Sequence, residues 1–363
     1  MENNKLNFRA IHKDIQADIP LNLSIENGRN YIYWGNSNDY PNFLFDLYCK
    51  CPTLQTIING SASFVAGDNV ECLTMHTPNP VMNWSELFSK LATDYFLFGI
   101  CYLQIVRNKG GEPSQVYYLD TRYVRTDKYN QRIWYNEDFA KKYTRNNKSI
   151  TYNAWNHLSD DASSIITIKT PQSRDTYGVP IWGSAIKPVI TETKIDEFNL
   201  NELENNFTAS AIISFNNGIP SEKEMDEIEK NIYEKFTGSE NAGRFLLSFN
   251  SSEENKTTVE RLSADNFADR YNNLGAKVEQ RIYTAFGASP VLFGYLNNSS
   301  GFNDQDYMQA FKLYNRTRIQ PVQKLFIDRI ESVVGSGSMS ITPFSINWSE
   351  TTDKSTNNQL ITE

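Results

Sequence analysis

Histidine and cysteine are scarce in this chain, which has three histidines and four cysteines among its 363 residues. His12, His76 and His157 lie far apart, and none belongs to an H-E-x-x-H motif or to another metal-ligand spacing. The cysteines form no C-x-x-C pair and are typical of free thiols. We therefore expect no metal site, no cofactor and no disulfide framework.

Long apolar runs and catalytic motifs are also missing. No run of about 18 apolar residues occurs, and the first residues lack the apolar stretch of a signal peptide. We therefore expect a protein that is made in the cytoplasm and has no membrane partner. The sequence contains no P-loop, no Rossmann glycine pattern and no G-x-S-x-G elbow, which favours a protein that is not an enzyme.

The net charge of −8 is concentrated in one segment. Residues 1–179 carry 18 acidic and 18 basic groups, residues 180–287 carry 18 and 11, and residues 288–363 carry 7 and 6, so the segments sum to 0, −7 and −1. A tight nucleic-acid binder would cluster lysine and arginine instead. The basic stretch at residues 122–148 is interpreted as a solvated strand face, with phosphate contact as the alternative.

Apolar periodicity predicts most of the secondary structure. The predicted helices cover residues 52–66, 84–98, 181–206, a segment from the Ser221 cap to Gly238, 263–286 and 304–334 with a kink at Pro321. The predicted strands cover residues 100–107, 115–118, 165–169, 209–215, 245–249, 257–262 and 340–348. The first 40 residues are expected to form a peripheral arm, and the mixture of elements indicates an α+β fold.

Five short sequence elements occur in an order that resembles the tailed-bacteriophage portal family, in particular the shorter siphovirus-type portals. They are Leu119-Asp120 with Val124, Tyr177-Gly178-Val179-Pro180, Gly238-Ser239-Glu240-Asn241-Ala242-Gly243, Ala285-Phe286-Gly287-Ala288-Ser289-Pro290-Val291-Leu292-Phe293-Gly294, and Pro321 with Leu325 and Ile330. The resemblance covers about residues 50–335. Three details differ: Pro180 falls one place early, Ser289 replaces a proline and Phe293 replaces a leucine.

The resemblance implies an α+β portal fold in which an α/β wing, two stem helices, a small β-α-β-β clip, a tunnel loop and a long kinked helix are followed by a minimal crown. The implied regions are an N-terminal arm (1–40), the wing (41–179), stem helix 1 (180–207), the clip (208–262), stem helix 2 (263–287), the tunnel loop (288–303), the long helix (304–335) and a short C-terminal strand and tail (336–363).

The implied function is a ring, a dodecamer, that conducts DNA at one capsid vertex of the virion after assembly in the host cytoplasm. The implied partners are further copies of the chain, the terminase large subunit, the head–tail adaptor, the major capsid or scaffold protein, and viral double-stranded DNA held weakly.

The resemblance also implies roles for particular residues. The tunnel loop would line the DNA channel with Asn297, Asn298, Ser299, Ser300, Gly301, Phe302 and Asn303. The clip would meet adaptor and terminase through Glu222, Glu224, Asp226, Glu229 and Asn241. The stem would pack through Phe267, Tyr271, Leu274, Val278 and Ile282.

Two other functions remain open at this stage. One is a cytoplasmic enzyme with an unrecognised site. The other is an aromatic-rich ligand-binding module, for example for glycans, which the 20 tyrosines, 21 phenylalanines and 6 tryptophans suggest. Many of these aromatic residues lie on helical stripes, where core packing is the simpler explanation.

Overall fold

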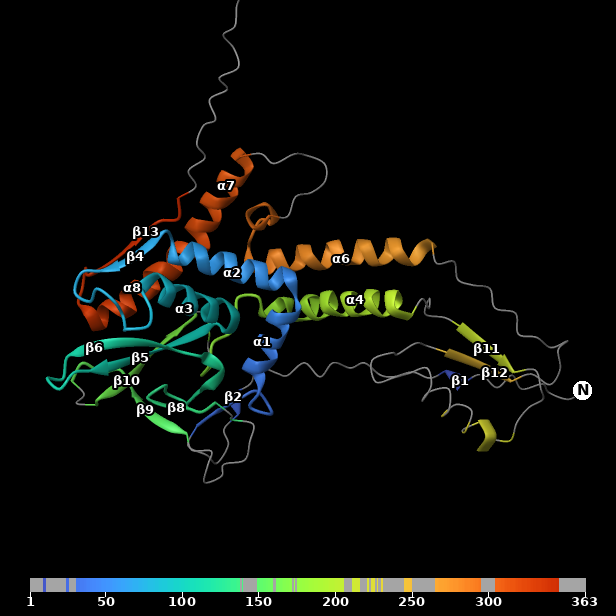
Figure 1. The fold of residues 1–363 in the computed structure, drawn as a ribbon, viewed down its shortest axis with the longest axis horizontal. Coiled ribbons are helices and arrows are strands. Elements are labelled where there is room, and N and C mark those ends of the chain that lie inside the picture. Colours follow the sequence, from blue (N-terminus) through green and yellow to red (C-terminus); the bar gives the residue numbers. More distant parts are fainter. Residues whose placement is uncertain are drawn as a thin grey trace, which may run out of the picture. The chain divides into compact units, whose positions relative to one another are not determined.

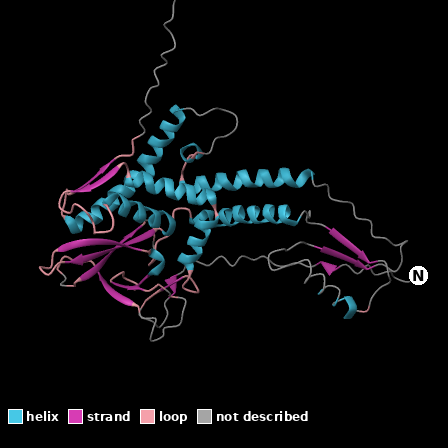
Figure 2. Ribbon diagram, in the orientation of Figure 1, coloured by secondary structure: helices cyan, strands magenta, loops and turns pink. Residues whose placement is uncertain are grey.

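The computed structural model describes most of the chain (Figures 1 and 2). The described residues are 9–10, 24–25, 31–137, 139, 149–158, 161–171, 173, 175–205, 211–215, 221, 223–225, 227, 230, 245–249, 265–294 and 304–345. Helices and strands both contribute, as Figure 2 shows, so the predicted α+β class is confirmed. The chain divides into two compact units, which we call the helical unit (Met1–Leu21, Phe43–Gln55, Ile181–Pro290) and the sheet unit (Asn22–Asn42, Thr56–Pro180, Val291–Glu363).

A six-stranded sheet forms the centre of the sheet unit. Its strands are β5 (Ile100–Arg107), β6 (Pro113–Leu119), β7 (Val124–Thr126), β8 (Arg132–Tyr135), β9 (Ile150–Ala154) and β10 (Ser163–Lys169), in the order β6-β5-β10-β9-β8-β7. Neighbouring strands are antiparallel except β9 and β10, which are parallel. Two smaller antiparallel pairs are β4 (Asn69–Cys72) with β13 (Met339–Thr342) and β2 (Ser24–Ile25) with β3 (Tyr33–Trp34).

Helix α3 (Trp84–Phe98) has the predicted bounds and packs against this sheet with its apolar side. Leu87 and Leu91 are fully buried. Asn83 caps the helix, since its side chain accepts from the backbone N–H of Glu86 while the Glu86 carboxylate accepts from the N–H of Asn83. Gly99 ends the helix in the left-handed conformation, with φ of 75°.

Gly99 and Gly178 lie in close contact. Gly99 follows the end of α3, and Gly178 lies just before the chain passes from the sheet unit to the helical unit. A Cβ atom at Gly178 would overlap the carbonyl group of Gly99, and one at Gly99 would overlap the carbonyl group of Val179. The sequence element Tyr177–Pro180 therefore contains a glycine because only a backbone without a side chain fits at this crossing.

Residues 31–40 are part of the core of the sheet unit, so the predicted peripheral arm is wrong for this stretch. The Trp34 ring is fully buried and stacks on Tyr177, with ring centroids 4.4 Å apart and planes 2° from parallel. The Tyr177 hydroxyl donates to the carbonyl of Ile32 at 2.5 Å and accepts from the backbone N–H of Thr126. This segment has turn residues and no apolar periodicity. Its burial comes from partners distant in sequence, so the sequence pattern did not predict it.

The helical unit contains two long helices, α4 (Ile186–Asn205) and α6 (Asp265–Phe286). The helix predicted from residue 181 begins later, because Gly183–Ala185 forms a 3-10 turn, η2. Strands β1 (Arg9–Ala10), β12 (Phe245–Phe249) and β11 (Ala211–Phe215) form a sheet in that order, with β11 and β12 parallel. The strand predicted at residues 257–262 lies outside the described residues.

Two further helices contribute to both units. Helix α1 (Tyr40–Lys50) was not predicted, and helix α2 (Pro52–Ala66) has the predicted bounds. The junction between them holds Cys51, which is buried along with Cys72 and Cys101, whereas Cys49 is exposed; all four are free thiols.

The predicted kinked helix consists of three segments. Helix α7 (Asp304–Tyr314) passes into a π-helical turn, η5 (Asn315–Ile319), and then into α8 (Gln320–Val334). Pro321 cannot donate to the carbonyl one helical turn before it, and the N–H of Gln320 donates instead to the carbonyl of Asn315. A widened turn thus lies just before the proline, at the place where the sequence predicts the kink.

Gly178→Ala should lower the free energy of unfolding by about 3 kcal/mol, because the added methyl group forces the two backbones apart. Urea unfolding followed by circular dichroism measures this change. Gly275→Ala is the matched control, since its Cβ would meet no atom within 4 Å. The control should change stability by less than about 1 kcal/mol, and an equally small effect of Gly178→Ala would contradict the crossing.

Candidate functional site

The paired helices α4 and α6 are the most prominent feature of the helical unit (Figure 1). Val189 of α4 and Ile282 and Phe286 of α6 are fully buried. Further along each helix the apolar side chains are exposed, with Leu200 55% and Leu274 41% accessible. Exposed leucines on long helices are candidates for burial against other chains.

The residues predicted to pack the stem divide into three groups. Val278 and Ile282 are buried, at 5% and 0% exposure, and Leu274 is exposed in the single chain. Phe267 and Tyr271 belong to α6, but their side chains lie outside the described part of the structure. Their common role in stem packing stays a prediction.

Glu192 joins α4 to the start of α2. One carboxylate oxygen accepts from the backbone N–H of Thr53 at 3.3 Å, in the first turn of α2, where a negative charge is favourable. The other oxygen is buried without a partner among the described residues. Burial is the main cause that raises the pKa of Glu192 above its usual value, and it also raises the pKa of the neighbouring Cys51 thiol.

An aromatic cluster in the sheet unit surrounds Phe64 of α2. The other rings are Phe293, Phe311, Tyr314 and Phe344, and each lies within 6.1 Å of another member, measured between centroids. A hydrogen bond of 2.7 Å joins the hydroxyls of Ser61 and Tyr314. A Cβ at Gly60 would lie 2.6 Å from the Phe293 ring, so Gly60 leaves the space that this ring occupies.

The predicted tunnel-loop residues follow Phe293 in the chain. Asn297, Asn298, Ser299, Ser300, Gly301, Phe302 and Asn303 all lie outside the described residues. The described flanks are η4 (Pro290–Phe293) on one side and α7 on the other. The aromatic cluster includes residues from both flanks, so it fixes both ends of the segment to α2.

Most of the predicted clip residues also lie outside the described residues: Glu222, Asp226, Glu229 and Asn241. Glu224 is exposed, and its carboxylate accepts from the backbone N–H and the hydroxyl of Ser221. The Ser221 backbone hydrogen bond is the main cause that lowers the pKa of Glu224. The Glu224 half of the predicted capping box is therefore present, and the Ser221 hydroxyl donates to the Glu224 carboxylate. The docking role stays a prediction.

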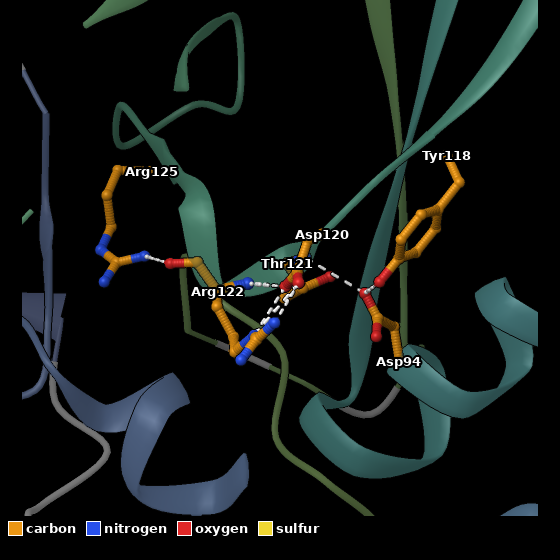
Figure 3. A network of polar contacts seen from close by, with 6 residues as sticks. All are labelled: Asp94, Tyr118, Asp120, Thr121, Arg122 and Arg125. Carbon is orange, nitrogen blue, oxygen red and sulfur yellow. Dashed lines mark hydrogen bonds and ion pairs between the residues drawn. The ribbon is translucent and has the colours of Figure 1, made fainter. Parts of the chain in front are cut away.

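A polar network connects α3 to the loop after β6 (Figure 3). Asp94 is buried, and its carboxylate accepts from the Tyr118 hydroxyl at 3.0 Å and from the backbone N–H of Thr121 at 3.1 Å. Asp120 forms an ion pair with Arg122, whose Nε and Nη2 both donate to it. Sequence reasoning missed Asp94, because a lone acidic residue within an apolar stripe carries no motif.

Burial raises the pKa of Asp94 from an ordinary value of 3.8 to about 7. The hydrogen bonds from Thr121 and Tyr118 oppose this effect, and the nearby Asp120 carboxylate adds to it. Asp94 therefore changes charge near neutral pH.

Arg125 corrects the interpretation of the basic stretch as a solvated face, because its side chain is 1% exposed. Its Nε donates to Asn38 Oδ1 at 2.5 Å, and its Nη atoms donate to the carbonyl oxygens of Asn38, Arg122 and Val124. Burial lowers the pKa of Arg125. This arginine attaches residues 31–40 to β7. That structural role explains why a charged residue occurs at this buried position.

Within the described ranges, no group of three or more histidine, cysteine, aspartate or glutamate side chains is placed to hold a metal ion. None of the described helices is long and apolar enough to span a membrane.

Asp94→Asn should remove a pH dependence of stability. Because the folded chain holds the Asp94 proton more tightly than the unfolded chain, this group's stabilisation is complete below about pH 4 and is lost as the pH rises through about 7. Asparagine keeps an acceptor for both hydrogen bonds and does not ionise. Melting temperatures from about pH 5 to about pH 8 should fall more steeply for the wild type than for Asp94→Asn. Parallel curves would contradict this assignment, and the exposed Asp46→Asn is the control.

Gly60→Ala should destabilise the aromatic cluster by about 1–3 kcal/mol, since the new methyl group displaces the Phe293 ring. Phe293→Leu, the residue of the family pattern, should also destabilise alone but should offset much of the Gly60→Ala effect in the double variant. A double-mutant cycle by urea unfolding measures this coupling, with the exposed Ser63→Ala on α2 as control. Simple additivity would contradict the contact.

Comparison with known proteins identifies the family. A family model described as phage portal protein matches residues 53–359. Uncharacterized proteins of Rickettsia bellii and Rickettsia felis are each 24% identical, over 256 and 251 residues, which is 68% of this chain in both cases. The chain thus spans 61% of the length of these curated relatives.

Two solved structures share the fold. A chain in the virion of a native gene transfer agent particle has a TM-score of 0.53 at 18% identity and covers 84% of this chain and 83% of its own length. A chain in the neck of the native particle, computed with C12 symmetry, has the same TM-score and identity and covers 84% of both chains. The family match extends over most of the sequence, in agreement with the resemblance found in its motifs, and the chain belongs to the phage portal protein family.

Proposed function

We propose that this chain is the subunit of a portal ring, a dodecamer through which double-stranded DNA enters and leaves a phage-like capsid. Membership in the portal family, from a match over residues 53–359, is the observation that carries the proposal. It favours an assembly component over the enzyme and the glycan-binding module. The number twelve is supported by the C12 symmetry stated for the neck of the similar gene transfer agent.

The paired helices support a tubular stem. With 20 and 22 residues, α4 and α6 are each about 30 Å long at a rise of about 1.5 Å per residue. Their buried faces pack together, and Leu200 and Leu274 remain exposed. In a ring, neighbouring copies would cover such residues, which a solitary subunit leaves in water.

The charge of the same region supports passage without tight binding. Residues 180–287 carry −7, and a ring multiplies that value by the number of subunits. A negative wall repels DNA phosphates and reduces adhesion while DNA moves. In this proposal the terminase large subunit supplies the force and the catalysis.

The remaining assignments belong to the same proposal. Residues 41–179 form the wing and residues 208–262 the clip, which docks terminase during packaging and the head–tail adaptor afterwards. Scaffold or major capsid protein surrounds the ring at the portal vertex of the virion. The segment at 297–303 narrows the channel and touches DNA through amide and hydroxyl groups, which bind phosphate weakly.

Ile282→Asp tests the stem. The new carboxylate would be buried without a cation, at a cost of about 3 kcal/mol or more, so rings should fail to form. Gln280→Asp, at an exposed position of α6, is the control and should assemble. Electron micrographs of the purified variants provide the measurement, and normal rings from Ile282→Asp would contradict the stem assignment.

Deletion of Asn298–Gly301 tests the channel role. Rings should still form, because the aromatic cluster that holds the flanks of this segment stays unchanged, while packaged DNA per particle should fall. Replacement of the same four residues by Gly-Ser-Gly-Ser keeps the loop length. It therefore separates the effect of loop length from the effect of the side chains. Nuclease-protected DNA is the measurement, and unchanged protection in the deletion variant would refute the tunnel-loop assignment.

A further inference from the structure

The long kinked helix contains an unbroken basic segment. From Tyr307 to Ile327 the sequence has four basic residues, Lys312, Arg316, Arg318 and Lys324, and no acidic residue. Nothing in the overall charge reveals this, since residues 288–363 sum to −1.

Three of these cations lie on the exposed side of the helix. Lys312, Arg316 and Lys324 are exposed, as is Gln320 between them, so exposed polar residues recur every four positions. We call Lys312, Arg316 and Lys324 the basic stripe. The Arg316 guanidinium donates to Gln320 Oε1 at 3.1 Å, which orients it along the stripe.

The π-helical turn improves the alignment of the stripe. In a regular α-helix a step of four residues overshoots one turn by about 40°, so three steps would move a residue by about 120° around the axis. Turn η5 uses about one more residue per turn and offsets part of this rotation between Arg316 and Gln320. This turn therefore keeps Lys324 closer to the face of the helix that carries Lys312 and Arg316.

The opposite side of the helix fixes the direction of the stripe. Phe311, Tyr314, Ile319, Val322 and Phe326 are buried. Phe326 packs edge-to-face on Phe88 and Tyr95 of α3, with centroids 5.8 and 5.6 Å apart. A helix held by this many buried side chains cannot turn its cations inward.

The charges of the stripe are not neutralised within the described part of the chain. None of the three cations forms an ion pair with a described residue. The nearest acidic residues along the helix, Asp306 and Asp328, lie beyond its two ends. A row of cations that form no ion pair with a described residue, on a helix held by buried side chains, is suited to a polyanion.

We infer that the basic stripe is a contact surface for the phosphates of double-stranded DNA. This inference rests on the proposed function, which brings DNA to the ring. The 12 steps from Lys312 to Lys324 span about 18 Å at about 1.5 Å each, the length of about five phosphates at about 3.4 Å per strand. The stripe would position DNA against the sheet unit, whereas the acidic region of residues 180–287 repels it.

A triple variant, Lys312→Gln/Arg316→Gln/Lys324→Gln, tests the inference on purified rings. A labelled 30-base-pair duplex is titrated at several salt concentrations, and the affinity is followed by fluorescence anisotropy. Each lost phosphate contact should reduce the slope of log affinity against log salt by about 0.9. The affinity at low salt should fall at least about tenfold, because three contacts are removed from every subunit.

The matched control removes three other exposed cations, Lys109, Arg132 and Arg329, by substitution with glutamine. Arg329 lies on the same helix outside the stripe. An equal loss of affinity in both variants would overturn the inference, since only net charge would then matter. Unchanged DNA affinity in the stripe variant would also overturn the inference. If those rings were in addition no longer incorporated into capsids, the stripe would be assigned to binding an acidic protein instead. Failure of the wild-type chain to form rings would refute the proposed function instead.

Discussion

The close approach of two backbones, at Gly99 and Gly178, is the constraint on which the sheet unit depends. Helix α3 ends there and β5 begins, and the segment that leads out of the sheet unit crosses at the same point. Tyr177, next to Gly178, stacks on Trp34 and bonds to Ile32, so the crossing also holds residues 31–40 in place. A side chain at either glycine would disturb all three segments at once.

Local patterns predicted the elements whose causes are local. Apolar spacing predicted the bounds of α2 and α3. The core position of Trp34, the buried Asp94 and the buried Arg125 could not be predicted, because their partners lie far away in sequence. Of the candidate site, the sequence placed Val278 and Ile282 on a buried face, and the motifs identified the family. The binding partners and the geometry of the ring cannot be predicted from one sequence, because they depend on contacts between chains.

Opposite charges occupy different parts of this portal family protein. Residues 180–287 are acidic, and the exposed side of the helix from Lys312 to Lys324 is basic. Repulsion by the first and attraction by the second would keep DNA in place without stopping it, because contacts to phosphate carry no sequence information. The π-helical turn that precedes Pro321 also brings the cations closer to one face of the helix. The buried side of the helix and its π-helical turn therefore both help to keep the cations on one exposed face.

In the proposed function, copies of this chain close into a ring around DNA. The most direct measurement is the mass of the assembled protein by light scattering, combined with class averages of top views by electron microscopy. We expect rings with a central opening and a mass of twelve subunits of 41.7 kDa. A protein that stays monomeric or dimeric at high concentration and in the presence of its scaffold protein would contradict the account.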